Sequence, residues 1–293
     1  MNLHPHTQLI NYAIALCKGH KDGFSALKGL GYDVQLIEQK ITTSEGEDVK
    51  PDLVKVSKKL QHAIVFECKS GSKDEQQMKR YEGLREEDLR RWVTITHSSQ
   101  PLKFDVCIVN FDTNYSNFVT ITKFPILTYG TQTISKSNKF SLKDLDDIFS
   151  TPIPIDRTKI PLNYYPFSDL DSDSVIIGRL LRQLVSMVIK RSRGGTNTLD
   201  ANLFPVEDIV VSLHPYWDAL SLEHRNRLTN RIRILLRRLT NAYPRLAEQL
   251  EEDRTNSFRV RGPPSRFTSL CEEIITESTI QLTLDFNQES YHG

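Results

Sequence analysis

Three side chains at the ends of two short apolar runs have the types and spacing to hold a divalent cation. Asp52 opens one run, and Glu67 and Lys69 close the next. Two carboxylates, with water and a backbone carbonyl such as that of Cys68, form the oxygen-rich shell that Mg²⁺ prefers. Such a cation lowers the pKa of bound water, and a lysine ammonium can stabilise developing negative charge. The set is therefore suited to hydrolysis of a phosphate ester.

The elements that position these side chains are two strands, expected over residues 53–56 and 63–66 and separated by the turn-like segment SKKLQ. Side chains alternate across a strand, so Glu67 and Lys69 leave the same face. A hairpin of the two strands would bring Asp52 to that end only with a bend or offset in the first strand.

A second motif follows on a charged helix expected over residues 73–92, where Gln77 and Tyr81 lie one turn apart as QxxxY. The chain resembles the PD-(D/E)xK nuclease superfamily in the order of its motifs, which are Pro51-Asp52, Glu67-Cys68-Lys69 and Gln77 with Tyr81. The resemblance covers roughly residues 8–127. It implies a restriction-endonuclease-like mixed sheet flanked by helices, and it implies the bend that brings Asp52 to Glu67.

The resemblance also implies roles for these residues. Asp52, Glu67 and the backbone carbonyl between Glu67 and Lys69 would bind Mg²⁺ or Mn²⁺. Lys69 would complete the catalytic set, and Gln77 and Tyr81 would contact the substrate. The expected activity is metal-dependent hydrolysis of DNA. Proteins of this plan occur in bacterial restriction, repair, transposition and anti-phage defence, which favours a role in defence or mobile-element processing.

Many members of that superfamily also place a Glu or His of the first helix in the metal shell. Here the first expected helix offers only Gln8 and Asn11, and His4 and His6 precede it. Glu38, on the first strand, is another candidate. This fourth contribution therefore stays open.

Each motif has a simpler explanation when it stands alone. An ExK triplet is common in a chain of which 26% is charged, PD is a frequent turn dipeptide, and a helical tyrosine is often part of the core. Their conjunction favours the nuclease interpretation. An inactive nuclease-like DNA-binding or assembly protein and an RNA- or single-strand-directed nuclease remain as alternatives. For the latter, bases could stack on Tyr115, Tyr129, Tyr164 and Tyr165.

The chain divides by composition into three parts. Residues 1–150 alternate between helical and strand patterns, which predicts an α/β nuclease domain. Residues 151–174 contain four of the 13 prolines and little periodicity, which predicts an extended linker. Residues 175–293 are mainly helical, and within them residues 175–266 hold 16 basic against 9 acidic residues. That excess is typical of a module that binds a polyanion.

A helix expected over residues 221–242 carries the side chains that we expect to face DNA, which are Asn230, Arg231, Arg233 and Arg237. With the short helix 206–213 before it and the segment NSFRVRG after it, this helix would complete a winged helix-turn-helix. A solvated face paired to acidic neighbours is the alternative. DNA binding is favoured because the acidic residues do not interleave with the arginines of the helix.

Composition also bounds location and partners. No run approaches the ~18 apolar residues of a membrane span, and the N-terminus lacks the pattern of a secretory signal. The four cysteines lie far apart without metal-like spacing, so we expect reduced thiols, a cytoplasmic protein and no membrane partner. DNA is the expected partner, with RNA in the alternative above. No GxxxxGK[ST] motif occurs, so energy-driven steps would need a partner ATPase subunit, and a homodimer stays open.

Overall fold

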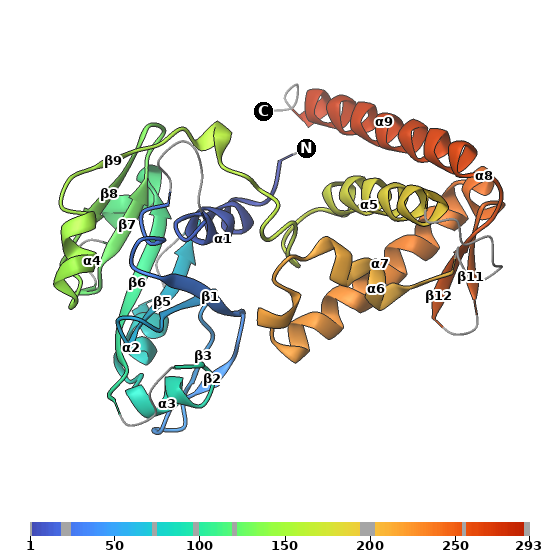
Figure 1. Cartoon of the computed structure of the whole chain (residues 1–293). Coiled ribbons are helices and arrows are strands. Elements are labelled where there is room, and N and C mark those ends of the chain that lie inside the picture. The colour runs from blue at the N-terminus through green and yellow to red at the C-terminus, as the bar shows by residue number, and fades with distance from the viewer. Residues whose placement is uncertain are drawn as a thin grey trace. The chain divides into compact units, whose positions relative to one another are not determined.

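The computed structural model describes residues 2–18, 25–71, 75–95, 100–118, 122–193, 203–253 and 256–289, with residues 278–289 described by their backbone alone. The chain forms two compact units (Figure 1). The sheet unit comprises residues 5–165 and 216–224, and the helical unit comprises residues 1–4, 166–215 and 225–293. Each unit is described by itself below.

A seven-stranded mixed sheet forms the centre of the sheet unit, in the order β1-β4-β5-β6-β7-β8-β9. Its strands are β1 Tyr32–Ile37, β4 Leu53–Ser57, β5 His62–Lys69, β6 Lys103–Phe111, β7 Ile126–Tyr129, β8 Thr133–Ser137 and β9 Ile153–Pro154. Strands β5, β6 and β7 are parallel, and the other neighbours pair antiparallel. The expected α/β class, a mixed sheet flanked by helices, is confirmed.

Helices pack on both faces of this sheet because its central strands are apolar on both sides. Helix α1 (Pro5–Ala15) covers one face, where the buried Tyr129 hydroxyl donates to the Tyr12 carbonyl at 3.2 Å. Helices α2 (Glu75–Glu82) and α3 (Glu86–Arg90) lie on the other face, where Met78 and Tyr81 join one apolar cluster with Val54 and Val65. The single helix expected over residues 73–92 is thus two helices, interrupted at Gly83, and residues 73 and 74 lie outside the described part.

The smaller elements of the sheet unit are a hairpin of β2 (Ile41–Thr42) and β3 (Asp48–Val49), helix α4 (Lys143–Ile148), and the short helical turns η1 (Asp112–Asn117), η2 (Arg157–Lys159) and η4 (Trp217–Ala219). After η4, Leu220 forms a bridge with Ile37 at the end of β1. This contact explains why residues 216–224 belong to the sheet unit.

The segment 151–174, expected as an extended linker, is packed instead. Ile153 and Pro154 form the edge strand β9, where a proline is tolerated because its missing N–H faces away from the ladder. Tyr165 and Phe167 are fully buried, and Asp171 is nearly so. The prolines correctly indicated that this segment is not a long helix. They gave no indication that the aromatic side chains between and beside them are buried.

The helical unit combines helices with a small antiparallel sheet of order β10-β12-β11. Its elements are α5 Asp173–Arg193, β10 Leu203–Pro205, α6 Val206–Leu213, α7 Leu222–Ala242, α8 Pro244–Ala247, β11 Leu250–Asp253, β12 Ser257–Val260 and α9 Pro264–Glu289, with the first turn of α7 in the sheet unit. Ser221 precedes α7 and caps its N-terminus, because its hydroxyl accepts from the His224 amide at 3.2 Å. Among the described residues, no helix has the length and apolar character to cross a bilayer.

Candidate functional site

The β4–β5 hairpin sets the positions of Asp52 and Glu67. Leu53 pairs with Phe66 in regular antiparallel register, and the Asp52 amide donates to the Phe66 carbonyl at 3.1 Å. The paired register ends there, and Asp52 Oδ2 accepts from the Cys68 amide at 2.6 Å, next to Glu67 on β5. The predicted bend is present at Asp52, directly before the first residue of β4, and it places the Asp52 carboxylate against the backbone of Cys68.

Glu67 is the centre of a buried hydrogen-bond network that unites the motif residues. Its Oε1 accepts from the Gln77 amide at 2.7 Å and lies 2.8 Å from the Lys69 ammonium. Its Oε2 accepts from the Tyr81 hydroxyl at 2.5 Å. The Lys69 ammonium also donates to Gln77 Oε1. The structure therefore brings together Glu67, Lys69, Gln77 and Tyr81, which the sequence had joined only as a pattern.

Tyr81 lies deeper than a substrate contact would. Its side chain belongs to the apolar cluster under α2 and is 1% exposed, and its hydroxyl is occupied by Glu67. Gln77 is half-buried at the edge of the network. The expected substrate contact is therefore retained for Gln77, while Tyr81 supports the Glu67 carboxylate from below.

The Glu67 carboxylate has an altered proton affinity. Burial and, next, the negative charge of Asp52 raise the pKa of Glu67 from 4.5 to about 7, although Lys69 and the Tyr81 hydroxyl act in the opposite direction. An acid with such a pKa can take up or release a proton near neutral pH. Shifts of this origin are frequent at functional sites.

His6, in the first turn of the first helix, lies against the acidic residues of the predicted site. Helix α1 begins at Pro5, one position earlier than His6, so the imidazole projects from its first turn. Its Nε2 lies 3.2 Å from Asp52 Oδ1, and its Nδ1–H donates to the Cys68 carbonyl at 3.0 Å. The alternative, Asn11, is used elsewhere, because its side chain holds the backbone of Tyr165 through two hydrogen bonds.

The charge around His6 changes its pKa. Burial lowers the pKa of His6, but the attraction of Asp52, the hydrogen bond to Asp52 and the charges of Glu38 and Glu67 outweigh burial and raise it to about 9. His6 is consequently an imidazolium at neutral pH, paired with the Asp52 carboxylate. The Cys68 carbonyl, an expected metal ligand, is occupied by His6 Nδ1–H.

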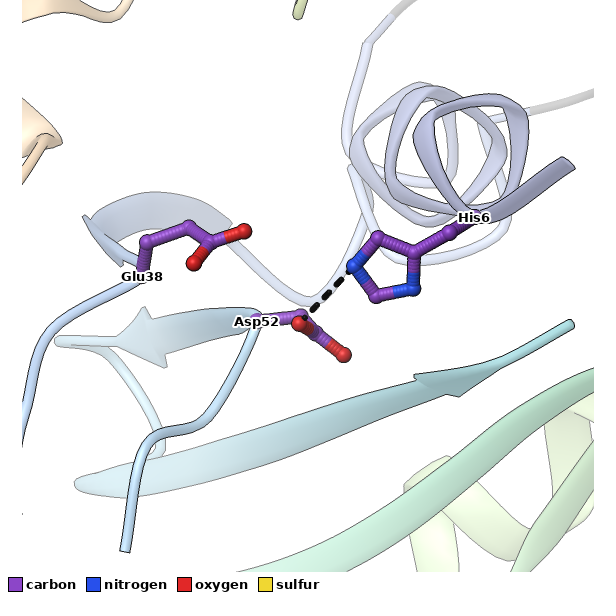
Figure 2. A group of neighbouring side chains, drawn as sticks. All are labelled: His6, Glu38 and Asp52. Carbon is purple, nitrogen blue, oxygen red and sulfur yellow. Dashed lines mark ion pairs between the residues drawn. The ribbon is translucent and has the colours of Figure 1, made fainter. Parts of the chain in front are cut away.

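Glu38 completes this cluster from the end of β1. Its amide donates to the Asp52 carbonyl at 3.1 Å, and its carboxylate pairs with the Lys50 ammonium. One ligand atom each of His6, Glu38 and Asp52 lies within 4.8 Å of the other two, with Asp52 between its neighbours (Figure 2). Within the described ranges this is the group of His, Cys, Asp and Glu side chains that could hold a metal ion. One imidazole and two carboxylates form a suitable donor set for a divalent cation.

The arginines predicted to contact DNA have partners within the helical unit. Arg231 donates to the carbonyls of Ser168, Asp169 and Asp171 and lies 2.9 Å from an Asp173 carboxylate oxygen. Arg231 therefore fixes the segment that leads into α5, and its guanidinium is not available for the expected contact with DNA.

Two of the remaining predicted contacts line a hollow of about 450 Å³ beside β11 and β12. Arg237 holds Glu252 with two parallel hydrogen bonds of 2.6 and 2.7 Å. Arg233 donates to Asn230 and to Asn256. An acidic residue of the neighbouring β11–β12 hairpin thus pairs with an arginine of α7. The sequence comparison within the helix alone could not reveal this pairing. The alternative of a solvated face paired to acidic neighbours describes Arg237 correctly.

The tyrosines considered for stacking on single strands are mostly unsuited to that role. Tyr129 and Tyr165 are fully buried in the sheet unit. Tyr115 is half-buried, and its hydroxyl lies 2.7 Å from that of Ser137. Tyr129 and Tyr165 therefore cannot stack on bases, which removes part of the support for an RNA- or single-strand-directed nuclease.

Comparison with known proteins identifies a family for the sheet unit. No curated protein and no solved structure matches the chain. The family model of the MJECL32 domain matches residues 5–165, which begin with α1, end at Tyr165 and include every residue of the cluster described above. Since this match covers more than half of the 293 residues, the chain belongs to the MJECL32 domain family.

Proposed function

We propose that this chain is a metal-dependent nuclease that hydrolyses phosphodiester bonds in DNA. One observation carries the proposal: Asp52, Glu67 and Lys69 meet at the end of a β-hairpin, with His6 and Glu38 beside them. Buried charged groups are costly unless they compensate one another or bind a cation. Their concentration at one point of a strand end is therefore better explained by chemistry than by stability.

The residues present fit a divalent cation by the chemistry of their donor atoms. A cation bound beside Asp52 would acidify a water molecule and neutralise charge on the scissile phosphate. Lys69 is held by Glu67 and Gln77 with its side chain 15% exposed, so it can donate to a phosphate oxygen as negative charge develops. Glu67 orients both of these side chains.

The architecture supports the same reading. A mixed sheet with the two acidic residues on neighbouring strands and QxxxY on the next helix agrees with a PD-(D/E)xK nuclease. In the helical unit, α5, β10, α6 and α7 are followed by the short helix α8 and the β11–β12 hairpin, an order that agrees with the expected winged helix. We propose that this unit supplies DNA affinity, and that the protein acts in defence or mobile-element processing.

The alternative of a DNA-binding protein that does not cut is less well supported. That alternative rests on the absence of an acidic residue from the first helix, but His6 in the first turn of α1 lies 3.2 Å from Asp52. The residues assigned to cleavage are gathered at one point.

A substrate panel tests the proposal. The full-length protein is incubated with supercoiled plasmid, single-stranded DNA and RNA, each with Mg²⁺, Mn²⁺ or a chelator. We expect cation-dependent nicking or linearisation of the plasmid, abolished by Lys69→Ala. Absence of cleavage with every cation would overturn the proposal, and faster cleavage of RNA would favour the RNA-directed alternative.

A further inference from the structure

We propose that the cation is held by His6, Glu38 and Asp52, not by Asp52 and Glu67, and that this trio favours a first-row transition cation such as Mn²⁺ over Mg²⁺. The inference concerns the site of the proposed function, but cation binding can be measured whether or not DNA is cleaved.

The trio is assembled from three separate elements. His6 lies in the first turn of α1, Glu38 follows β1, and Asp52 precedes β4. Glu38 and Asp52 are each at most 9% exposed, so the carboxylates are held largely out of water. Asp52 lies between the other two side chains, and each trio member offers an atom within 4.8 Å of the others (Figure 2).

The imidazole of His6 is oriented as a metal ligand would be. Its Nδ1–H donates to the Cys68 carbonyl at 3.0 Å, which turns Nε2 toward Asp52. In metalloproteins the second ring nitrogen of a ligating histidine commonly donates to a backbone carbonyl or a carboxylate, and this fixes the tautomer and the ring plane. The hydrogen bond to Cys68 is an observation separate from the clustering of the acids.

The position of Glu38 is set by its backbone. Its φ of 55° lies in the left-handed region, which is uncommon for a residue other than glycine, and its amide donates to the Asp52 carbonyl at 3.1 Å. The side chain pairs with Lys50, whose own side chain is 42% exposed. A divalent cation can therefore take over the neutralisation of Glu38 while the Lys50 ammonium moves into water.

Glu67 is engaged in a different way. Both of its oxygens accept from α2 residues, Gln77 at 2.7 Å and Tyr81 at 2.5 Å, and Lys69 lies 2.8 Å from Oε1. A cation bound to Glu67 would compete with three donors, one of them positively charged. Within the trio, the competing contacts are the partly exposed Lys50 ammonium at Glu38, the Cys68 amide, which donates to Asp52 Oδ2 at 2.6 Å, and the proton of the His6 imidazolium, which a bound cation would displace.

The donor atoms decide which cation is favoured. Mg²⁺ is bound by oxygen ligands and water, whereas imidazole nitrogen suits transition cations. Two carboxylates with one imidazole suit Mn²⁺, which accepts both donor types. The presence of His6 in place of a third oxygen therefore shifts the preference away from Mg²⁺.

The test measures Mn²⁺ binding to the full-length protein by electron paramagnetic resonance of the free ion, with Mg²⁺ as competitor. We expect Glu38→Gln and His6→Gln each to weaken Mn²⁺ binding about tenfold or more, while Glu67→Gln changes it by less than about threefold. Glu45→Gln, an exposed acid of the same unit, serves as the matched control. Thermal melting verifies folding, and Glu38→Asp, which keeps the charge, replaces Glu38→Gln if that variant does not fold.

Two results would overturn the inference. One is loss of Mn²⁺ binding in Glu67→Gln with retention in the Glu38 variants, and the other is equal affinity for Mg²⁺ and Mn²⁺ in the unaltered protein. If Mn²⁺ binds as described but no nucleic acid is cleaved, the metal site stands and the proposed nuclease function fails.

Discussion

The Tyr81 hydroxyl donates a hydrogen bond to Glu67 Oε2 at 2.5 Å, from a side chain that is 1% exposed. Tyr81 is anchored in the apolar cluster between α2 and the sheet, so it fixes one oxygen of Glu67 at a depth that water cannot easily reach. The other oxygen is then presented to Lys69 and Gln77.

Removal of this hydroxyl is expected to impair cleavage. Tyr81→Phe keeps the ring in the core but leaves a carboxylate oxygen without its donor, so Glu67 and Lys69 lose their fixed orientation. We expect the cleavage rate to fall about 10- to 100-fold, as for other groups that support a site from outside. Tyr32→Phe is the matched control, since Tyr32 is also buried and its hydroxyl lies 2.8 Å from His62 Nδ1. An equal loss of cleavage in both variants would show a general effect of stability.

Glu67 makes folding stability depend on pH. Its pKa is about 7 in the folded chain and 4.5 as its ordinary value, so between these values the folded chain retains a proton that the unfolded chain has lost. The contribution of Glu67 to the free energy of unfolding is therefore full below pH 4.5 and declines as pH rises through 7. Relative to Glu67→Gln, the unaltered protein should lose about 1–3 kcal/mol over this interval.

Urea denaturation at a series of pH values, with a chelator present, measures that difference. A constant difference between the two proteins from pH 4.5 to pH 8 would contradict the assignment of a raised pKa to Glu67.

Part of this site could be predicted from the sequence, because the residues concerned are neighbours within one strand or one helix. Alternation along one strand placed Glu67 with Lys69, and helical periodicity placed Gln77 with Tyr81. His6 was named but left outside the helix, although Pro5 is a favoured first helical residue and was a usable signal. Glu38 was named as a candidate on the first strand, but its left-handed backbone just after β1, with a φ of 55°, had no marker in the sequence.

What was not predictable depends on contacts between distant segments. The acidic partner of Arg237 comes from β11, and Arg231 donates to backbone carbonyls before α5 and to the Asp173 carboxylate at its first residue. Lys55 lies inside a run that the sequence presents as apolar, yet it is fully buried. In each case the side chain alone indicated solvent exposure, and tertiary packing decided otherwise.

Lys55 gives a prediction of its own. Its ammonium donates to the Ala13 carbonyl and lies 4.8 Å from the centre of the Phe66 ring, and burial lowers its pKa from 10.5. The unfolded chain then binds more protons than the folded chain below pH 10.5, so stability rises with pH toward that value. The free energy of unfolding of Lys55→Met should rise less with pH than that of the unaltered protein. The difference in stability between the two proteins should therefore shrink as pH increases.

The measurement is the free energy of unfolding of both proteins between pH 7 and pH 10.5, with the exposed Lys58→Met as control. Parallel pH profiles for Lys55→Met and the unaltered protein would mean that Lys55 is not desolvated in the folded state.

The hollow on α7 predicts a salt-dependent effect on DNA affinity. Arg233→Ala combined with Arg237→Ala should weaken DNA binding and reduce the slope of log affinity against log salt by about 2, since each phosphate contact contributes about 0.9. Glu252→Gln removes the carboxylate that holds Arg237, so it should strengthen binding. Arg245→Ala, which alters an exposed arginine paired with Glu273, is the control. An unchanged slope in the double variant would remove α7 from the interface.

The most direct test of the central claim is the single-turnover cleavage rate of a labelled plasmid by Lys69→Ala and by the unaltered protein, with Mn²⁺ or Mg²⁺. Lys69 contacts Glu67 and Gln77 but is not part of the His6–Glu38–Asp52 trio, so its loss should spare cation binding. We predict a fall of about 100-fold or more in rate, with DNA affinity unchanged and a cooperative thermal transition retained. Cleavage by Lys69→Ala at the rate of the unaltered protein would contradict the account.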